Sequence, residues 1–327
     1  MPAMLRGQCP PQGTIRGLGF RLPAGMLGVV FPQLMAERGT RHMRVQAGAF
    51  RSLWRGLRFL EHVITGVLIL CVVGLGSRAG RRPAWLPGVV QWWYGRMSRA
   101  LGVRVNTVGA VADRCLLVCN HVSWLDPMVL GASGHMAFLA KAEIRGWPLI
   151  GWMSDLVGTL FIARGAHQVE SVTARISERI ARGETLAIFP EGTTSRGLGV
   201  RRFYPRLFAI AQQPGLGVQP VAILYHREGD PAPDQDIAFV DEESLIANLW
   251  RVLRHPGLVC EVQFLPPIWP RVEDQRRALS ALARRRIVTA LGLPEGAGMD
   301  APPRPGSRAG RLQAEADARS SADSSHG

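Results

Sequence analysis

A histidine and an aspartate five residues apart follow an apolar segment and could carry out proton transfer. The segment Cys115–Cys119 reads CLLVC and the next residues read NHVSWLD, so His121 and Asp126 lie where a strand would end. The ordinary pKa of a histidine side chain is about 6.5, so a neutral imidazole can accept a proton at neutral pH. A carboxylate that folds back onto the other ring nitrogen would fix the tautomer and stabilise the imidazolium. The pair therefore indicates a general base that acts on the hydroxyl of a bound substrate.

Ser123 lies between these two residues and raises the alternative of a hydrolase with a serine nucleophile. Hydrolases of the α/β type expose their serine on a G-x-S-x-G turn. No such turn surrounds Ser123. The hydrolase is therefore the weaker interpretation of this block.

A second cluster of polar residues follows another apolar segment, where residues 189–195 read FPEGTTS. Pro190 would end the strand, and Gly192 would let the backbone approach a ligand. We expect Glu191 to organise the loop, or to bind a substrate hydroxyl or a neighbouring arginine. Hydroxyls that could donate hydrogen bonds to an anion follow on Thr193, Thr194 and Ser195. Basic residues come next, at Arg196, Arg201, Arg202 and Arg206. The alternative is an ordinary turn between a strand and a helix, in which Pro, Gly and Thr are all common.

Three further segments carry candidate residues. Lys141 opens the segment KAEIRGWPLIGW, and Arg164 ends the apolar segment in GTLFIARG. A guanidinium there could bind a phosphate through two hydrogen bonds, although a surface salt bridge is the alternative. In the segment VQPVAI, Pro220 interrupts an apolar strand and predicts an edge strand or a bulge.

The elements that must position these residues alternate between apolar strands and amphipathic helices. This alternation predicts an α/β fold with a mixed, mainly parallel sheet flanked by helices. The expected strands are Cys115–Cys119, Met136–Ala140, Thr159–Ala163, Thr185–Phe189, Val218–Tyr225 and Leu258–Leu265. The expected helices are 167–182, Ser244–Arg254 and Val272–Leu291.

The N-terminal part of the chain contains a candidate membrane helix at 59–76, FLEHVITGVLILCVVGLG. Its charge-free part, from Val63 to Gly76, would be about 21 Å long as a helix, against about 30 Å of hydrocarbon. The segment could therefore span the membrane or lie in its interface, and a buried core helix is the alternative. Arginines flank it on both sides and leave its orientation open. An aromatic and basic stretch suited to a bilayer interface follows, with Trp85, Trp92, Trp93, Tyr94, Arg96 and Arg99.

Charge supports a membrane surface as the partner of this region. The chain has a net charge of +14, and residues 1–100 hold 14 arginines against two acidic residues. No nucleic-acid-binding signature accompanies that charge, so we expect no nucleic-acid partner. Attraction to anionic lipids explains positive charge beside an apolar stretch better. The five cysteines include no C-x-x-C pair, which argues against a disulfide framework or a cysteine-rich metal site.

These observations divide the chain into four expected regions. Residues 1–45 and 293–327 are rich in small and polar residues and are expected to be disordered. Residues 46–100 would attach the protein to a membrane, and residues 101–292 would form the catalytic domain.

The order of the blocks resembles that of the 1-acylglycerol-3-phosphate acyltransferase family. NHxxxxD, K-x-E-x-x-x-x-P-x-x-G, G-x-x-F-I-x-R, FPEGTxS and V-Q-P-V follow one another over residues 115–265. The resemblance implies that His121 and Asp126 are the catalytic pair, with His121 deprotonating the hydroxyl of a lysolipid. That hydroxyl would attack the thioester of acyl-CoA or acyl-acyl carrier protein, giving phosphatidic acid from 1-acylglycerol-3-phosphate. No metal or bound cofactor is implied, because the thioester is already activated.

The resemblance also implies a binding region for the acceptor phosphate, and one departure bears on it. The implied region comprises Arg164, Glu191, Gly192 and Thr193, with Thr194 beside them and Lys141 in the second block. Members of the family often have Phe-Lys shortly after FPEGTxS, whereas Phe203 is followed here by Tyr204 and Pro205. The basic role would then pass to Arg202 or Arg206, and another lysolipid such as lyso-ornithine lipid becomes an alternative acceptor. A non-catalytic module that binds lipid or carrier protein is the alternative of another class. The expected location is a bacterial-type inner membrane, with the catalytic domain on the cytoplasmic side.

Overall fold

The computed structural model describes residues 24–76, 83–147, 149–162, 166–213, 215–240, 243–271 and 274–296. The chain forms two compact units, Met1–Gly48 and Ala49–Gly327. The described part of the first unit is the beginning of helix α1 (Ala24–Gly76), which continues into the second unit. Helix therefore replaces the irregular chain that the sequence predicted for 24–45. Good helix formers, mainly Leu, Met, Ala, Gln and Arg, dominate that stretch. The predicted tails at 1–23 and from 297 onward lie outside the described residues.

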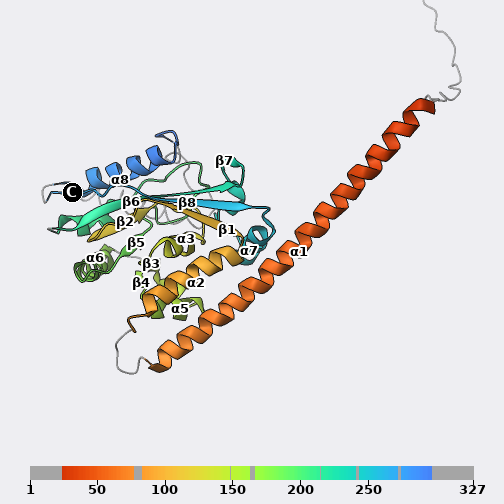
Figure 1. The fold of residues 1–327 in the computed structure, drawn as a ribbon. Coiled ribbons are helices and arrows are strands. Elements are labelled where there is room, and N and C mark those ends of the chain that lie inside the picture. The colour runs from red at the N-terminus through yellow and green to blue at the C-terminus, as the bar shows by residue number, and fades with distance from the viewer. Residues whose placement is uncertain are drawn as a thin grey trace, which may run out of the picture. The chain divides into compact units, whose positions relative to one another are not determined.

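The second unit is built on one eight-stranded sheet (Figure 1). Its strands are β1 (Val103–Val108), β2 (Cys115–Cys119), β3 (Ala137–Lys141), β4 (Leu160–Ile162), β5 (Leu186–Ile188), β6 (Gly217–Arg227), β7 (Asp230–Pro233) and β8 (Leu258–Phe264). The strand order is β1-β8-β6-β2-β5-β3-β4, and β7 pairs with β6. β6 is antiparallel to β7 and β8, and the other pairs are parallel. The predicted mixed, mainly parallel sheet is confirmed.

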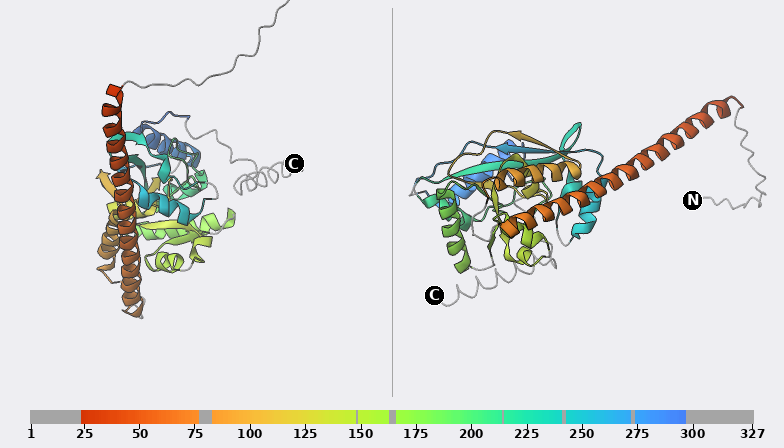
Figure 2. Two further views of the ribbon diagram at one scale, coloured as in Figure 1. Left: turned by 90° about the vertical axis from the view of Figure 1, so that its right-hand side faces the viewer. Right: turned by 60° about the horizontal axis from the view of Figure 1, so that its bottom comes forward.

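Helices cover both faces of this sheet, as the views in Figure 1 and Figure 2 show. They are α2 (Leu86–Ala100), α3 (Asp126–Ser133), α4 (Ala142–Arg145), α5 (Ile150–Leu156), α6 (Ala166–Ala181), α7 (Leu245–Arg254) and α8 (Arg276–Ala290), with 3-10 turns η1 (Pro205–Gln212) and η2 (Gln235–Ile237). Alternate residues of β2 serve opposite faces, because side chains alternate along a strand. Leu116 and Val118 join the core beneath α6 and α8, whereas Leu117 and Cys119 join the core beneath α2, α3 and α7.

The six predicted strands and three predicted helices are all present, with ends that shift by a few residues. Strands β1 and β7 and helices α3, α4 and α5 have no counterpart among the predictions. Pro220 does not mark an edge, because β6 lies inside the sheet between β2 and β8. The register beside it is irregular, as the alternative of a bulge predicts: Val221 pairs with Phe264 and Val218 bridges Ile268. Pro220 is tolerated there because antiparallel pairing with β8 begins one residue later, at Val221. The Pro220 carbonyl still accepts a hydrogen bond from the N–H of Leu265 (3.0 Å).

Candidate active site

The two blocks of polar residues, NHVSWLD and FPEGTTS, meet at one edge of the sheet. β2 and β5 are adjacent and parallel, so the loops after their carboxyl ends emerge side by side. Two hydrogen bonds join these loops at His121. Its carbonyl accepts from the N–H of Ser195 (2.8 Å), and its N–H donates to Glu191 Oε1 (2.7 Å). The sheet therefore places the histidine of the first block directly against the second block.

His121 and Asp126 form the pair that the sequence predicts. Nδ1 of His121 lies 2.7 Å from Oδ2 of Asp126. The Asp126 side chain is fully buried, whereas the His121 side chain is 20% exposed. The contact with Asp126 uses Nδ1, so Nε2 is the nitrogen that can take a proton from a hydroxyl. The ring also stacks on Phe189, with centroids 4.1 Å apart and planes inclined by 19°. The imidazole is thus held both along its edge and across its face.

Asp126 is itself held by donors on three sides. Its Oδ2 accepts from the N–H groups of Val122 (2.7 Å) and Ser123 (3.0 Å), and its Oδ1 accepts from the hydroxyl of Tyr225 (2.8 Å). Asp126 is also the first residue of α3, where the helix dipole favours a negative charge. A buried carboxylate needs such compensation, because burial of an unpaired charge is costly. These contacts orient the Asp126 carboxylate toward the imidazole.

Glu191 organises the loops and does not face solvent. Its side chain is 3% exposed, and its second oxygen accepts from the N–H of Arg201 (2.9 Å). Burial raises the pKa of Glu191 to about 8, although its two backbone hydrogen bonds and the Arg201 charge act in the opposite direction. This geometry differs from the implied contact with the acceptor. Of the roles considered for Glu191, only the organisation of the loop agrees with both oxygens being bound to backbone N–H groups.

The rest of the FPEGTTS block divides between structural and exposed residues. The Thr194 hydroxyl donates to the carbonyl of Phe239, so it fastens the loop. Gly192 and Thr193 are exposed. Gly192 has a φ of +69°, and a Cβ there would lie 2.7 Å from the ring of Tyr204. A glycine is therefore required both by its backbone conformation and by the tyrosine beside it.

The predicted basic residues are spread more widely. Arg202 and Arg206 are exposed after the second block, and Lys141 is exposed at the end of β3. In the sheet, β5 separates β3 from β2, so Lys141 is carried on a more distant strand than Glu191. Arg164 lies outside the described residues.

Two residues of the site were missed by sequence reasoning, namely Phe189 and Tyr225. Phe189 ends the strand segment before Pro190, and the alternation along Val221, Ile223 and Tyr225 puts those three on one sheet face. Those signals are present in the sequence. The neighbour that each ring meets depends on the strand order, which the sequence pattern does not specify.

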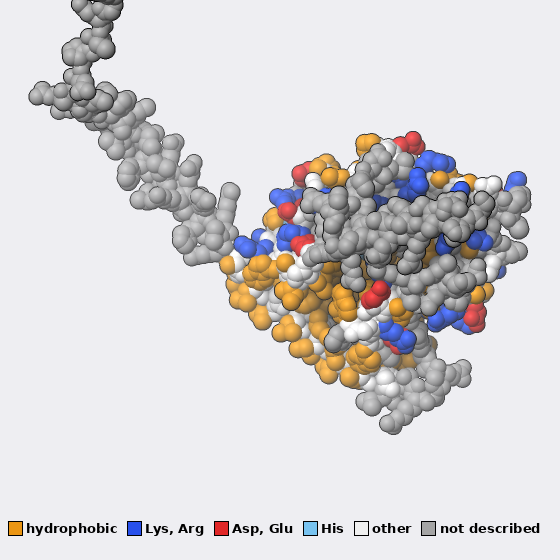
Figure 3. Space-filling model, turned by 180° about the vertical axis from the view of Figure 1, so that it is seen from behind, with side chains coloured by type: hydrophobic (Ala, Val, Ile, Leu, Met, Phe, Trp, Pro, Cys, Tyr) orange, Lys and Arg blue, Asp and Glu red, His pale blue; other side chains and the backbone are white. Residues whose placement is uncertain are grey.

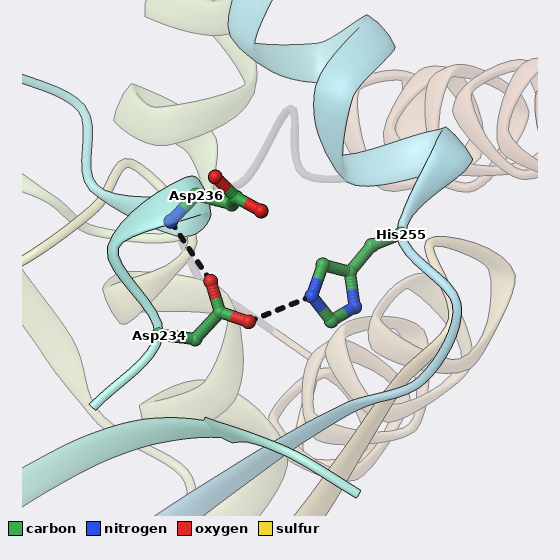
Figure 4. A group of neighbouring side chains, drawn as sticks. All are labelled: Asp234, Asp236 and His255. Carbon is green, nitrogen blue, oxygen red and sulfur yellow. Dashed lines mark hydrogen bonds and ion pairs between the residues drawn. The ribbon is translucent and has the colours of Figure 1, made fainter. Parts of the chain in front are cut away.

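A second group with ligand-type side chains comprises Asp234, Asp236 and His255 (Figure 4). Asp234 accepts from the N–H of Asp236 (2.8 Å) and lies 2.8 Å from Nε2 of His255. Arg227 contacts both carboxylates, at 3.6 and 3.4 Å. A cation is therefore already supplied by the chain, and the group ties η2 to the end of α7.

Comparisons with known proteins agree with this geometry. A family model described as Acyltransferase matches residues 103–224. The chain is 38% identical to a lyso-ornithine lipid O-acyltransferase of Pseudomonas aeruginosa, over 74% of this chain and 93% of that protein. It is 36% identical to a 1-acyl-sn-glycerol-3-phosphate acyltransferase of Neisseria gonorrhoeae, over 46% of this chain and 58% of that protein.

A solved structure shows the same fold. The crystal structure of the 1-acyl-sn-glycerophosphate acyltransferase PlsC from Thermotoga maritima matches with a TM-score of 0.55 and 20% identity, covering 76% of this chain and 98% of that one. Together with the paired His121 and Asp126, the long match to the Pseudomonas protein resolves the family. The chain belongs to the acyltransferase family and is an O-acyltransferase that acts on lysolipids.

Proposed function

We propose that His121 is the general base of acyl transfer from acyl-CoA or acyl-acyl carrier protein to a lysolipid. Nε2 of His121 takes the proton of the acceptor hydroxyl as the oxygen attacks the thioester carbonyl. The tetrahedral intermediate then collapses, the carbon–sulfur bond breaks, and the imidazolium returns the proton to the departing thiolate. The 2.7 Å contact between His121 and Asp126 carries this proposal, because the carboxylate stabilises the imidazolium that forms. The chain's own residues and the activated thioester account for every proton and bond, without a metal or bound cofactor.

Lyso-ornithine lipid is the acceptor that we favour. The Pseudomonas relative named for it matches 74% of this chain, against 46% for the Neisseria relative. Tyr204 supports the same choice. It is 58% exposed beside Gly192, close to where the family pattern often has a lysine. The Tyr204 phenol supplies none of the positive charge that a lysine would offer to a phosphate, and an ornithine headgroup carries its own amine beside its carboxylate.

1-Acylglycerol-3-phosphate remains the second candidate acceptor. The order of the sequence blocks resembles the family that acylates this lipid. Arg202 and Arg206 could bind its phosphate, since exposed guanidinium groups bind phosphate and carboxylate alike.

An assay with both acceptors tests the function. Purified protein in detergent or vesicles would receive each lysolipid in turn, with acyl-CoA and acyl-acyl carrier protein as alternative donors. We expect turnover of lyso-ornithine lipid to exceed turnover of 1-acylglycerol-3-phosphate. The reverse order would replace our first acceptor by the second. Turnover of neither, with both donors supplied, would contradict the proposed function.

We further propose that α1 and α2 attach the protein to the membrane surface. The sequence Gly48–Gly74 is long and apolar enough to cross a bilayer. One side of this helix, however, packs on the domain through polar contacts. His62 Nε2 lies 2.9 Å from the carbonyl of Trp93, and Trp93 Nε1 donates to the carbonyl of His62 (3.0 Å). Arg55 donates to the carbonyl of His255 (2.6 Å).

The other side of the helix is exposed and mainly apolar, whereas an ordinary surface helix turns its polar side to solvent and its apolar side to the core. Figure 3 shows hydrophobic side chains gathered along this part of the surface. The exposed large hydrophobic residues of α1 are Phe50, Leu53, Trp54, Leu57, Leu60, Ile64, Leu68 and Val72. One charged residue, Glu61, is exposed among them and pairs with Arg58 and Arg96. A groove of about 510 Å³ continues this surface between α1 and α2, lined by Leu68, Ile69, Val72, Trp85, Val89 and Trp92.

Such a surface fits a helix that lies in the bilayer interface better than one that spans it. The acyl donors are cytoplasmic molecules, so the proposed location is the cytoplasmic face of a bacterial inner membrane.

A further inference from the structure

The second oxygen of Asp126 has its own donor, which no sequence block supplies. Oδ2 serves His121 and two backbone N–H groups, whereas Oδ1 accepts from the Tyr225 hydroxyl at 2.8 Å. Tyr225 is 2% exposed and comes from β6, one strand away from the strand that leads to His121. His121, Asp126 and Tyr225 therefore form a continuous hydrogen-bonded series.

The backbone of β6 around Tyr225 is held by hydrogen bonds to two other segments of the chain. Asn120 donates to the carbonyl of Ile223 (2.9 Å) and accepts from its N–H (2.8 Å), which joins β6 to the residue before His121. The Tyr225 carbonyl accepts from the N–H of Asp234 (2.8 Å). The tyrosine is thus attached to the same loop that carries the histidine.

The Tyr225 hydroxyl also remains a donor over the whole working range of pH. Burial, and then the Asp126 charge, raise the pKa of Tyr225 well above its ordinary value. A phenol that does not ionise always presents its proton to the carboxylate. The hydroxyl has one proton and donates it to Oδ1, so Tyr225 serves Asp126 as a hydrogen-bond donor.

We propose that Tyr225 is a positioning residue of the acyl transfer reaction, which orients Asp126 and limits how strongly that carboxylate attracts the proton on His121. This inference rests on the proposed role of His121 as general base. Without the hydroxyl, Oδ1 would be a buried acceptor with no donor, which is costly in a site closed to water. The carboxylate would then be held less firmly on its Oδ1 side, and the charge that it no longer shares with the tyrosine would pull more strongly on the imidazole proton.

Several ionisable groups face Asp126 from the surrounding elements, and the ionisation of any of them could alter the pH profile of the reaction. They are His121 and Cys119 from β2 and its loop, Glu191 from the loop after β5, Tyr225 from β6 and Cys260 from β8. Burial raises the pKa of both cysteines well above the ordinary value, so they stay as thiols. Glu191 is common to the wild type and the variant below, so a difference between their profiles reports the tyrosine.

The substitution Tyr225→Phe tests this inference, because it removes one hydroxyl and keeps the ring that packs in the core. We expect kcat to fall about tenfold, the effect of an unsatisfied buried acceptor on an orienting group. KM for the acceptor should change little, because Tyr225 lies behind Asp126 and touches no substrate. The acid limb of the kcat/KM profile should move to higher pH, because the imidazole then releases its proton less readily.

Ser280→Ala is the control, because it also removes one buried hydroxyl. Ser280 lies on α8, its hydroxyl donates to the carbonyl of Arg277 (2.9 Å), and its variant should keep the wild-type kcat and pH profile. Thermal unfolding of both variants separates loss of fold from loss of rate. The inference is overturned if Tyr225→Phe keeps both the kcat and the pH profile of the wild type while His121→Ala is inactive. If His121→Ala also keeps its turnover, the proposed function fails instead.

Discussion

At the scale of single residues, the side chains proposed to transfer a proton differ from those that hold the loops in place. His121 is the partly exposed member of the pair and the group that we propose faces the acceptor, whereas the Asp126 side chain that contacts it is fully buried. Glu191 does no proton chemistry in this account, although it lies one hydrogen bond from His121. Its two oxygens hold the backbone of both loops, so its contribution is to the geometry of the base.

The ionisation of Glu191 gives a test of that structural role. With a pKa of about 8 against an ordinary 4.5, the folded protein keeps a proton that the unfolded chain releases. The stability from this group is therefore present at low pH and lost as the pH rises through about 8. Glu191→Gln cannot ionise, and its amide faces a backbone N–H, so it should cost about 1–3 kcal/mol.

Thermal unfolding at pH 5, 6.5 and 8 measures this effect. The melting temperature advantage of the wild type over Glu191→Gln should be largest at pH 5 and shrink toward pH 8. Glu228→Gln, which changes an exposed carboxylate, is the control and should show no such trend. An advantage that stays constant with pH would contradict the raised pKa.

At the scale of elements, three neighbouring strands build the site. β5, β2 and β6 run parallel, and their adjacent carboxyl ends bring together Glu191, His121 and Tyr225. Asn120 joins two of these strands through its reciprocal hydrogen bonds with Ile223. The register of the strands is therefore part of the active-site geometry.

Removal of the Asn120 amide tests this connection. Asn120→Ala leaves the N–H and the carbonyl of Ile223 without their buried partner, so the free energy of unfolding should fall by about 1–3 kcal/mol. Urea unfolding measures the change. Asn106→Ala is the control, because Asn106 is exposed and bonds only across the surface to Glu261, and it should cost less than about 0.5 kcal/mol. Equal costs for the two variants would contradict the structural role of Asn120.

Comparison of the predicted with the observed strands and helices shows which elements the sequence pattern reveals. Apolar segments and helical periodicity predict six strands, three helices and the α/β class, because burial of one face leaves a readable pattern. β1 and β7 were missed because their side chains are largely exposed and leave no apolar signal. An edge was predicted at Pro220 because proline has no N–H to donate, but a proline is tolerated in an inner strand where no neighbouring carbonyl requires that donor.

The candidate site follows the same division. The contact of His121 with Asp126 is local in sequence, so a five-residue spacing predicts it. Tyr225 is 99 residues from Asp126 along the chain, and their contact depends on β6 lying beside β2. The family resemblance assigned Glu191 to the acceptor, whereas the residues alone left open that it organises the loop. Its burial is decided by the packing of the loop after β5.

At the scale of the whole molecule, the enzyme must reach a lipid acceptor at the bilayer surface. We propose that the exposed apolar side of α1 and the groove against α2 provide this contact, and that the basic N-terminal region adds attraction to anionic lipid. The polar contacts of Arg55 and His62 fix this surface to the catalytic domain. Membrane attachment and catalysis therefore belong to one folded unit.

A charge placed on this surface should weaken membrane binding without loss of fold. Leu68 is 61% exposed, and Leu68→Glu should reduce the partitioning to anionic vesicles at least about tenfold, since the leucine no longer enters the interface. Vesicle sedimentation measures the bound fraction. Val108→Glu, at a similarly exposed apolar residue of β1, is the control and should bind as the wild type does. Equal binding of Leu68→Glu and the wild type would show that α1 does not contact lipid.

The most direct test of the whole account is acyl transfer by His121→Ala, measured beside its melting temperature and vesicle binding. We expect turnover to fall about a thousandfold, because the general base is removed. The melting temperature and the fraction bound to vesicles should stay unchanged. A variant that folds, binds vesicles and keeps more than about a tenth of the wild-type turnover would contradict the central claim that this imidazole activates the acceptor.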